Sequence, residues 1–158
     1  MEPTQFFRQK KWLFFVGIKA LIVKNEKLLV LSSGSSELSS TKRKRAFWDL
    51  PGGKVEWGED IQETLQREVQ EELGIRRGSL QAIEIFEASV SKIRTSHAVH
   101  VPLILITFIC RLQGRQKFKL SDEHASYKWV GAGTAQKLLS TKFNKTFIKK
   151  LGSLRTKS

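Results

Sequence analysis

Three glutamates in the middle of the chain have the spacing of a site for a divalent cation. Glu68, Glu71 and Glu72 stand at positions i, i+3 and i+4, so on a helix they fall within about 100° of one another. Like charges that close repel each other, and Arg67 is the nearby residue that can offset them. Carboxylate oxygens suit Mg²⁺ or Mn²⁺, and those ions serve reactions of phosphate groups. The glutamates therefore predict a metal-assisted reaction of a phosphate compound, with a solvated acidic face as the alternative.

A helix over residues 60–73 is predicted to position the glutamates. Apolar residues recur there at every fourth position and form one stripe: Ile61, Leu65, Val69 and Leu73. Gly74 follows the last of them, in the position where glycine commonly ends a helix. The glutamates lie beside this stripe, so we expect them near the junction of helix and core.

The residues around the glutamates form a longer pattern, which covers Gly53 to Ile75. The order is Gly53, five residues, Glu59, seven residues, Arg67-Glu68-Val69, one residue, Glu71-Glu72, one residue, Gly74-Ile75. This order resembles the Nudix box, G-x5-E-x7-R-E-U-x-E-E-x-G-U with U aliphatic, at every fixed position. Such spacing is far more specific than an isolated glycine motif. The resemblance extends from about Phe14 to Leu139 and includes the Leu50-Pro51-Gly52-Gly53 segment before the box.

The resemblance to Nudix hydrolases implies a fold and a metal site. The family has an α/β/α sandwich around a mixed β-sheet, so we expect the α/β class. Its members bind Mg²⁺ through the box glutamates, here Glu68, Glu71 and Glu72. The backbone carbonyl just before the box glycine, here that of Gly52, often joins them. Mg²⁺ or Mn²⁺ is therefore the expected cofactor.

Catalytic and structural roles follow from the same resemblance. Glu68 is the candidate for orienting or deprotonating the attacking water, and Arg67 would hold the carboxylates, with Glu59 as its partner. The structural residues of the box are Gly53, Glu59 and Gly74. Glu123 lies six residues before Trp129, where several related enzymes carry a glutamate that acts as base or metal ligand. An ordinary polar loop residue is the alternative for Glu123, and the choice of base stays open.

Contacts with a substrate are less well specified. Candidate contacts for phosphate are Lys42 to Arg45, Lys54, Lys92 and Arg94. Trp48 and Phe47 are candidates for stacking on a base, with core packing as the alternative. None of the three histidines has the spacing of a metal site, and His97 and His100 are expected to be edge residues. His124 is expected to be an ordinary polar residue, with contact to the substrate phosphate as the alternative because it follows Glu123.

The composition indicates a single basic domain. Lys and Arg number 28 against 15 Asp and Glu, for a net charge of +13, which attracts polyanions such as nucleotides and RNA. A basic surface that only aids solubility is the alternative. The single cysteine, Cys110, excludes an internal disulfide and suits a reducing compartment. The longest apolar run, residues 101–110, is too short to cross a bilayer. We therefore expect a cytoplasmic protein without a membrane partner.

The other elements can be assigned from periodicity and turn residues. A β-hairpin is predicted over residues 14–31, with a polar turn at 24–27. Two strands are predicted over 78–91 and 98–112, the second central because it is nearly all apolar. A short strand over 127–130 and helices over 134–139 and 142–151 follow. The expected organisation is a basic lead-in (1–12), one Nudix domain (13–152) and a basic tail (153–158).

The expected activity is Mg²⁺-dependent hydrolysis of a diphosphate linkage in a nucleoside diphosphate derivative. ADP-ribose enzymes tend to carry a proline where this chain has Val90, and dinucleoside polyphosphate enzymes a tyrosine that residues 89–93 lack. A nucleoside triphosphate is therefore the preferred substrate. The alternatives are a nucleotide sugar, the 5′ end of RNA, or binding of nucleotide or RNA without catalysis. A homodimer is expected only by analogy with the family.

Overall fold

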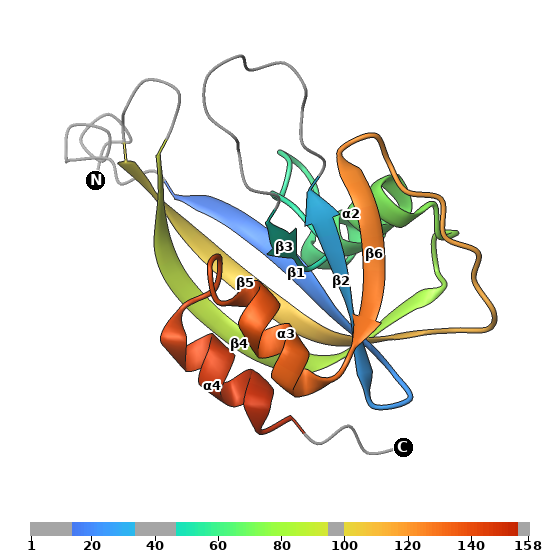
Figure 1. Cartoon of the computed structure of the whole chain (residues 1–158). Coiled ribbons are helices and arrows are strands. Elements are labelled where there is room, and N and C mark those ends of the chain that lie inside the picture. The colour runs from blue at the N-terminus through green and yellow to red at the C-terminus, as the bar shows by residue number, and fades with distance from the viewer. Residues whose placement is uncertain (1–13, 34–46, 95–99, 155–158) are drawn as a thin grey trace, which may run out of the picture.

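The computed structural model describes residues 14–33, 47–94 and 100–154. In chain order the elements are β1 (Phe15–Lys24), β2 (Lys27–Ser33), β3 (Trp48–Asp49), α2 (Ile61–Leu73), β4 (Leu80–Arg94), β5 (His100–Leu112), β6 (His124–Val130), α3 (Ala132–Leu139) and α4 (Lys145–Gly152). Figure 1 shows the strands as one twisted sheet with helices on both faces.

The sheet is mixed, as expected. Its strand order is β3-β2-β1-β5-β4, and β6 pairs with β2. β1 and β5 run parallel, in register from Phe15 opposite Leu103 to Ile22 opposite Cys110, whereas the other pairs are antiparallel. β5 lies between β1 and β4, which confirms the central position predicted from its apolar run.

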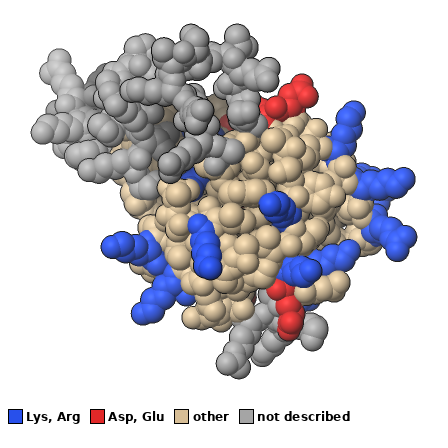
Figure 2. Space-filling view, in the orientation of Figure 1, with Lys and Arg blue, Asp and Glu red and all other residues tan. Residues whose placement is uncertain are grey.

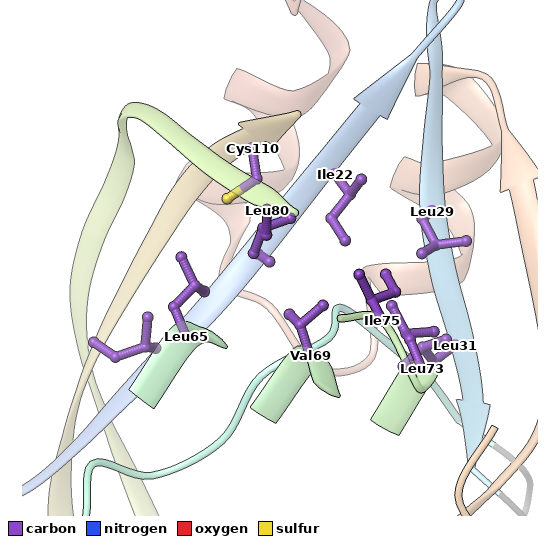
Figure 3. Close-up of a cluster of buried hydrophobic side chains, with 11 residues drawn as sticks. Ile22, Leu29, Leu31, Leu65, Val69, Leu73, Ile75, Leu80 and Cys110 are labelled. Atoms are coloured by element: carbon purple, nitrogen blue, oxygen red, sulfur yellow. The ribbon is translucent and has the colours of Figure 1, made fainter. Parts of the chain in front are cut away.

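Two hydrophobic clusters hold the helices against the sheet. On one face Leu65, Val69 and Leu73 of α2 pack against β1, β2 and Cys110 of β5 (Figure 3). On the other face Leu139 of α3 and Leu151 of α4 pack against a second set of strand residues. The chain therefore forms the expected α/β/α sandwich. None of the helices in the described ranges is long and apolar enough to cross a bilayer.

The ends of α2 are set by their own residues. Asp60 caps the start, because its side chain accepts from the Glu63 N–H while the Glu63 carboxylate accepts from the Asp60 N–H. Gly74 ends the helix in a left-handed conformation with φ 66°. Of the predicted apolar stripe, three members are buried, but Ile61 in the first turn is 38% exposed.

Several boundaries differ from the prediction. β6 begins at His124, three residues earlier than predicted, and the two-residue strand β3 was not predicted. α4 begins at Lys145 because the Asn144 side chain accepts a hydrogen bond from the Phe147 N–H and caps the helix. The predicted hairpin turn is present, with positive φ at both Asn25 and Glu26, the geometry that matches the twist of the flanking strands.

Candidate active site

The segment Leu50–Gly53, called the strap below, lies along one side of β1. The Ile18 N–H donates to the carbonyl of Gly53 at 2.8 Å, and the Val55 N–H donates to the carbonyl of Val16 at 2.8 Å. Gly52 has φ +128°, and a Cβ there would lie 2.1 Å from the carbonyl oxygen of Ile18. Only glycine allows the strap to approach β1 this closely.

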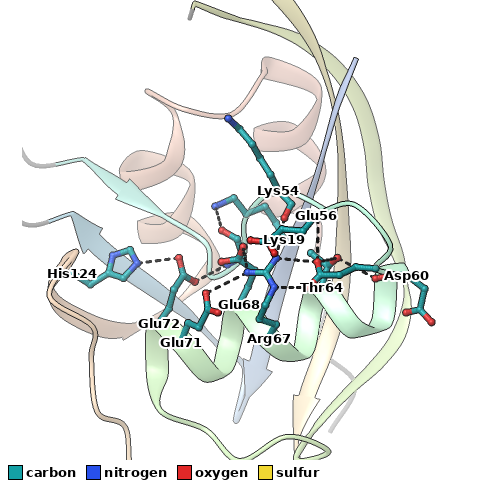
Figure 4. Close-up of polar contacts among 12 residues, drawn as sticks. Lys19, Lys54, Glu56, Asp60, Thr64, Arg67, Glu68, Glu71, Glu72 and His124 are labelled. Atoms are coloured by element: carbon teal, nitrogen blue, oxygen red, sulfur yellow. Dashed lines mark hydrogen bonds and ion pairs between the residues drawn. The ribbon is translucent and has the colours of Figure 1, made fainter. Parts of the chain in front are cut away.

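The strap also touches the glutamates of α2. The Gly52 N–H donates to Glu72 Oε2 at 2.7 Å. A Cβ on Gly53 would lie 2.3 Å from Glu68 Oε1, so the Glu68 carboxylate fills the space that a side chain at position 53 would need. The strap therefore lies against the polar side of α2. Figure 4 shows Arg67 and the three glutamates Glu68, Glu71 and Glu72 on that side of the helix.

Arg67 lies at the centre of the acidic residues. Its guanidinium contacts both oxygens of Glu59, with Nε 2.6 Å from Oε1 and Nη2 3.0 Å from Oε2. Its Nη1 lies 2.9 Å from Glu68 Oε1 and 3.3 Å from Glu71 Oε2. The predicted contact between Arg67 and Glu59 is thus present. The hydrogen bonds from Arg67 lower the pKa of Glu59 to about 2.

The box glutamates differ in their surroundings. Burial raises the pKa of the Glu68 carboxyl above its ordinary value, against the opposing effect of Arg67. The Glu71 side chain is 59% exposed, so the site is open to solvent at that residue. A partly buried carboxyl group thus stands beside an exposed carboxylate.

His124 binds Glu72, a contact that the sequence did not predict. Its Nε2 lies 3.0 Å from Glu72 Oε1, so both oxygens of that carboxylate are engaged. The hydrogen bond to Glu72 raises the pKa of His124. The pairing of β6 with β2 places His124 opposite Ser33. The sequence carried only a weak signal for this role, the position of His124 directly after the candidate Glu123.

Lys19 is a second residue that the sequence did not single out. It is buried in β1, and its Nζ donates to Asp49 Oδ2 at 2.8 Å and to the carbonyls of Leu50 at 3.0 Å and Gly52 at 2.9 Å. The signal was a lone lysine within an apolar strand. A carbonyl oxygen has two lone pairs, so the Gly52 carbonyl retains one for a metal ion.

The remaining predicted site residues do not contact Glu68, Glu71 or Glu72 in the described part of the chain. Glu123 is exposed in the turn before β6, and its side chain makes no hydrogen bond or ion pair within the described ranges. Trp48 is half-buried in β3, with Lys128 Nζ 5.0 Å from its ring centre. Lys54 is exposed, with Nζ 4.3 Å from the ring centre of Phe15. Arg45 and His97 lie outside the described residues.

The donor set fits a hard divalent cation. Glu68 and Glu71 both contact Arg67, and Glu72 contacts the Gly52 N–H of the strap. Oxygen donors of this kind, carboxylates and a backbone carbonyl, are those that Mg²⁺ and Mn²⁺ prefer. In this arrangement Arg67 supplies the positive charge between Glu68 and Glu71. Among the described residues no three Asp, Glu, His or Cys side chains already form a metal site.

Comparison with known proteins decides the family. The NUDIX domain model matches residues 14–151, which is most of the chain. The chain belongs to the NUDIX family. It is similar over 91% of its length to the solved structure of a MutT protein from Methanosarcina mazei, of which it covers 96%, with a TM-score of 0.64 and 25% identity.

Two curated relatives of this chain are named for different activities. The asymmetrical bis(5′-nucleosyl)-tetraphosphatase of Sus scrofa is 33% identical over 102 residues, covering 64% of this chain and 67% of the relative. The nucleoside triphosphatase NudI of Escherichia coli is 37% identical over 89 residues, covering 52% of this chain and 60% of the relative. The match thus spans about two thirds or less of these relatives. The chain is a Nudix hydrolase that acts on phosphoric anhydride bonds.

Proposed function

We propose that this Nudix hydrolase is a Mg²⁺- or Mn²⁺-dependent pyrophosphohydrolase of nucleoside polyphosphates, with a nucleoside triphosphate as the first candidate substrate. The observation that carries the proposal is the grouping of Glu68, Glu71 and Glu72 beside the strap. Three carboxylates close together on one helix repel one another, and a bound cation would offset that repulsion further than Arg67 and His124 do.

The chain's own groups have distinct roles in this proposal. Glu68, Glu71, Glu72 and the carbonyl of Gly52 would hold the ion. When bound, the ion supplies positive charge against the phosphate oxygens and polarises water. Arg67 keeps the carboxylates grouped while no ion is bound.

Two groups compete for the role of base. Glu68 is half-buried, and its raised pKa makes it a better proton acceptor than an exposed glutamate. Glu123 is exposed at the turn before β6, from which it could reach a bound substrate. The pH–rate profiles of Glu68→Gln and Glu123→Gln separate the two. The variant that lacks the base should lose the rise in rate on the acidic side of the profile, and its kcat should fall by about 100-fold or more. The variant that lacks the other glutamate should keep that rise in rate.

A dinucleoside tetraphosphate is the second candidate substrate. The curated relative from Sus scrofa is named as a bis(5′-nucleosyl)-tetraphosphatase, and this supports the candidate although the chain lacks the tyrosine expected near residues 89–93. Both candidates carry adjacent phosphoric anhydride bonds, so the same metal site would serve either.

The test is a hydrolysis assay with purified protein, with Mg²⁺ or Mn²⁺ and after chelation. The panel contains canonical and oxidised nucleoside triphosphates, dinucleoside tetraphosphate, nucleotide sugars, ADP-ribose and triphosphorylated RNA. We expect Glu71→Gln to lower kcat/KM at least about 100-fold, whereas Glu84→Gln, an exposed substitution on β4, retains wild-type activity. Absence of hydrolysis across the panel, or full activity in Glu71→Gln, would overturn the proposal.

A further inference from the structure

Positive charge is concentrated at the C-terminal end of the chain. The 35 residues after Glu123 contain eight Lys and Arg and neither Asp nor Glu, whereas the first 123 residues contain 20 basic and 15 acidic residues. Eight of the thirteen net positive charges thus come from less than a quarter of the chain. A segment with this excess of positive charge and no acidic residue attracts polyanions.

Three lysines of this region are exposed on the helices α3 and α4, which contact each other. Lys137 of α3 and Lys145 and Lys149 of α4 are exposed, and they form no ion pair within the described ranges. Lys145 and Lys149 are four residues apart and share one side of α4. Gln136 Nε2 donates to the carbonyl of Ile148 at 2.8 Å and ties α3 to α4.

Figure 2 shows Lys and Arg side chains standing out from the face that these helices form in Figure 1. We call the face that carries Lys137, Lys142, Lys145 and Lys149 the basic surface.

The basic surface reaches the edge of the candidate active site through Lys142. Its Nζ contacts the carboxylate of Asp49, the residue just before the strap, and lies 4.7 Å from the ring centre of Phe47. Phe47 is 46% exposed. A second aromatic ring, Trp48, lies beside Lys128. Lys142 and Lys128 therefore place positive charge beside two aromatic rings, Phe47 and Trp48, that lie just before the strap.

The structure favours a nucleic acid over a membrane as the polyanion. A helix that lies on a bilayer needs an exposed apolar face. The apolar side chains of α3 and α4 face the core: Leu139, Phe147 and Leu151 are at most 2% exposed, and Leu138 and Ile148 are partly buried against the same cluster. Lysines along a path, with an exposed aromatic ring at one end, are typical of surfaces that bind single strands.

We propose that the basic surface binds the backbone of single-stranded RNA, with a base stacked on Phe47 at the edge of the active site. Binding depends on the lysines and on the ring, and it does not depend on the hydrolysis proposed above. If both hold, the surface would deliver the 5′ phosphates of a strand to the box glutamates.

The test measures the affinity of the full chain for a fluorescent single-stranded RNA by anisotropy, over salt from about 0.05 to 0.3 M. One variant combines Lys137→Gln, Lys145→Gln and Lys149→Gln. The control combines Lys24→Gln, Lys27→Gln and Lys117→Gln, which removes equal charge from exposed lysines elsewhere. We expect the first triple variant to lower affinity roughly 10- to 100-fold at 0.1 M salt and to reduce the salt slope by about 2. The control should stay within about threefold.

Two further variants separate the contributions. Phe47→Ala should weaken binding roughly tenfold without changing the salt slope, because stacking does not release counterions. Glu71→Gln should bind RNA as the wild type does, whatever its effect on hydrolysis. Loss of hydrolysis with RNA binding intact would therefore contradict only the proposed function.

Three outcomes would overturn the RNA proposal. The first is no binding at the lowest salt. The second is an equal loss of RNA affinity in both triple variants, which would indicate attraction by the overall charge of the protein rather than binding at the basic surface. The third is lysine-dependent binding to vesicles of anionic phospholipid without binding to RNA.

Discussion

Glu59, just before α2, and Arg67, in the middle of that helix, face each other through two hydrogen bonds of 2.6 and 3.0 Å. The Thr64 hydroxyl donates to the same carboxylate at 2.8 Å. This pairing fixes the guanidinium, so that its Nη1 points at the box glutamates Glu68 and Glu71. Glu59 therefore acts on the site through Arg67.

The Glu59–Arg67 pair predicts a dependence of stability on pH. Arg67 lowers the pKa of Glu59 from the ordinary 4.5 to about 2. Because the folded-state pKa is depressed, the stabilisation is present above about pH 4.5 and is lost as pH falls towards 2. Glu59→Gln should lower Tm at pH 7 and flatten the decline of Tm below pH 4.5. The measurement is thermal unfolding followed by circular dichroism. Identical curves for Glu59→Gln and wild type would contradict this account, and Glu84→Gln serves as the control.

The two glycines of the strap should respond differently to alanine. In Gly52→Ala the new Cβ meets backbone, 2.1 Å from the carbonyl oxygen of Ile18, at φ +128°. We expect a loss of at least about 1–3 kcal/mol in the free energy of unfolding. In Gly53→Ala the Cβ meets the carboxylate of Glu68, a side chain that can move.

Gly53→Ala should therefore fold with near-wild-type stability but lose roughly 100-fold in kcat, because Glu68 is displaced. Urea unfolding and steady-state kinetics on both variants provide the check. The explanation fails if Gly53→Ala is as unstable as Gly52→Ala or keeps full activity.

Lys19 should be needed for the strap to keep its conformation. Lys19→Met removes three donated hydrogen bonds and leaves Asp49 buried with one cationic partner, Lys142. We expect a loss of about 3–5 kcal/mol in the free energy of unfolding. The double variant Lys19→Met with Asp49→Asn should recover part of it, since no buried charge is then left unpaired. Chemical denaturation measures both, and a double variant less stable than Lys19→Met would argue against the ion pair.

His124 should matter because it holds Glu72. His124→Leu leaves that carboxylate with the Gly52 N–H as its partner in the described structure. We expect the Mg²⁺ concentration for half-maximal activity to rise about 10- to 100-fold. His124→Gln keeps a hydrogen-bond donor and should restore part of the response. A Mg²⁺ titration of activity is the measurement, and an unchanged midpoint in His124→Leu would show that Glu72 needs no such support.

Much of this molecule could be predicted from local residue patterns. The four-residue period from Leu65 to Leu73 predicted α2, and Gly74 marked its end. The apolar run in residues 101–110 predicted a central strand. The box spacing indicated the family and placed the three glutamates on one side of one helix. These features depend on residues close in sequence, where helix and strand periodicity fixes relative positions.

Only the tertiary structure decided which distant groups complete the site. Lys19 binds the carbonyl of Gly52 across 33 residues of sequence, and His124 binds Glu72 across 52. These contacts depend on the register of β6 on β2 and on the course of the strap along β1. A shift of one residue in such a pairing turns every side chain to the opposite face. The sequence by itself therefore determined the acidic helix and its chemistry, and the packing of the sheet determined that His124 and Lys19, rather than Glu123, contact the site residues.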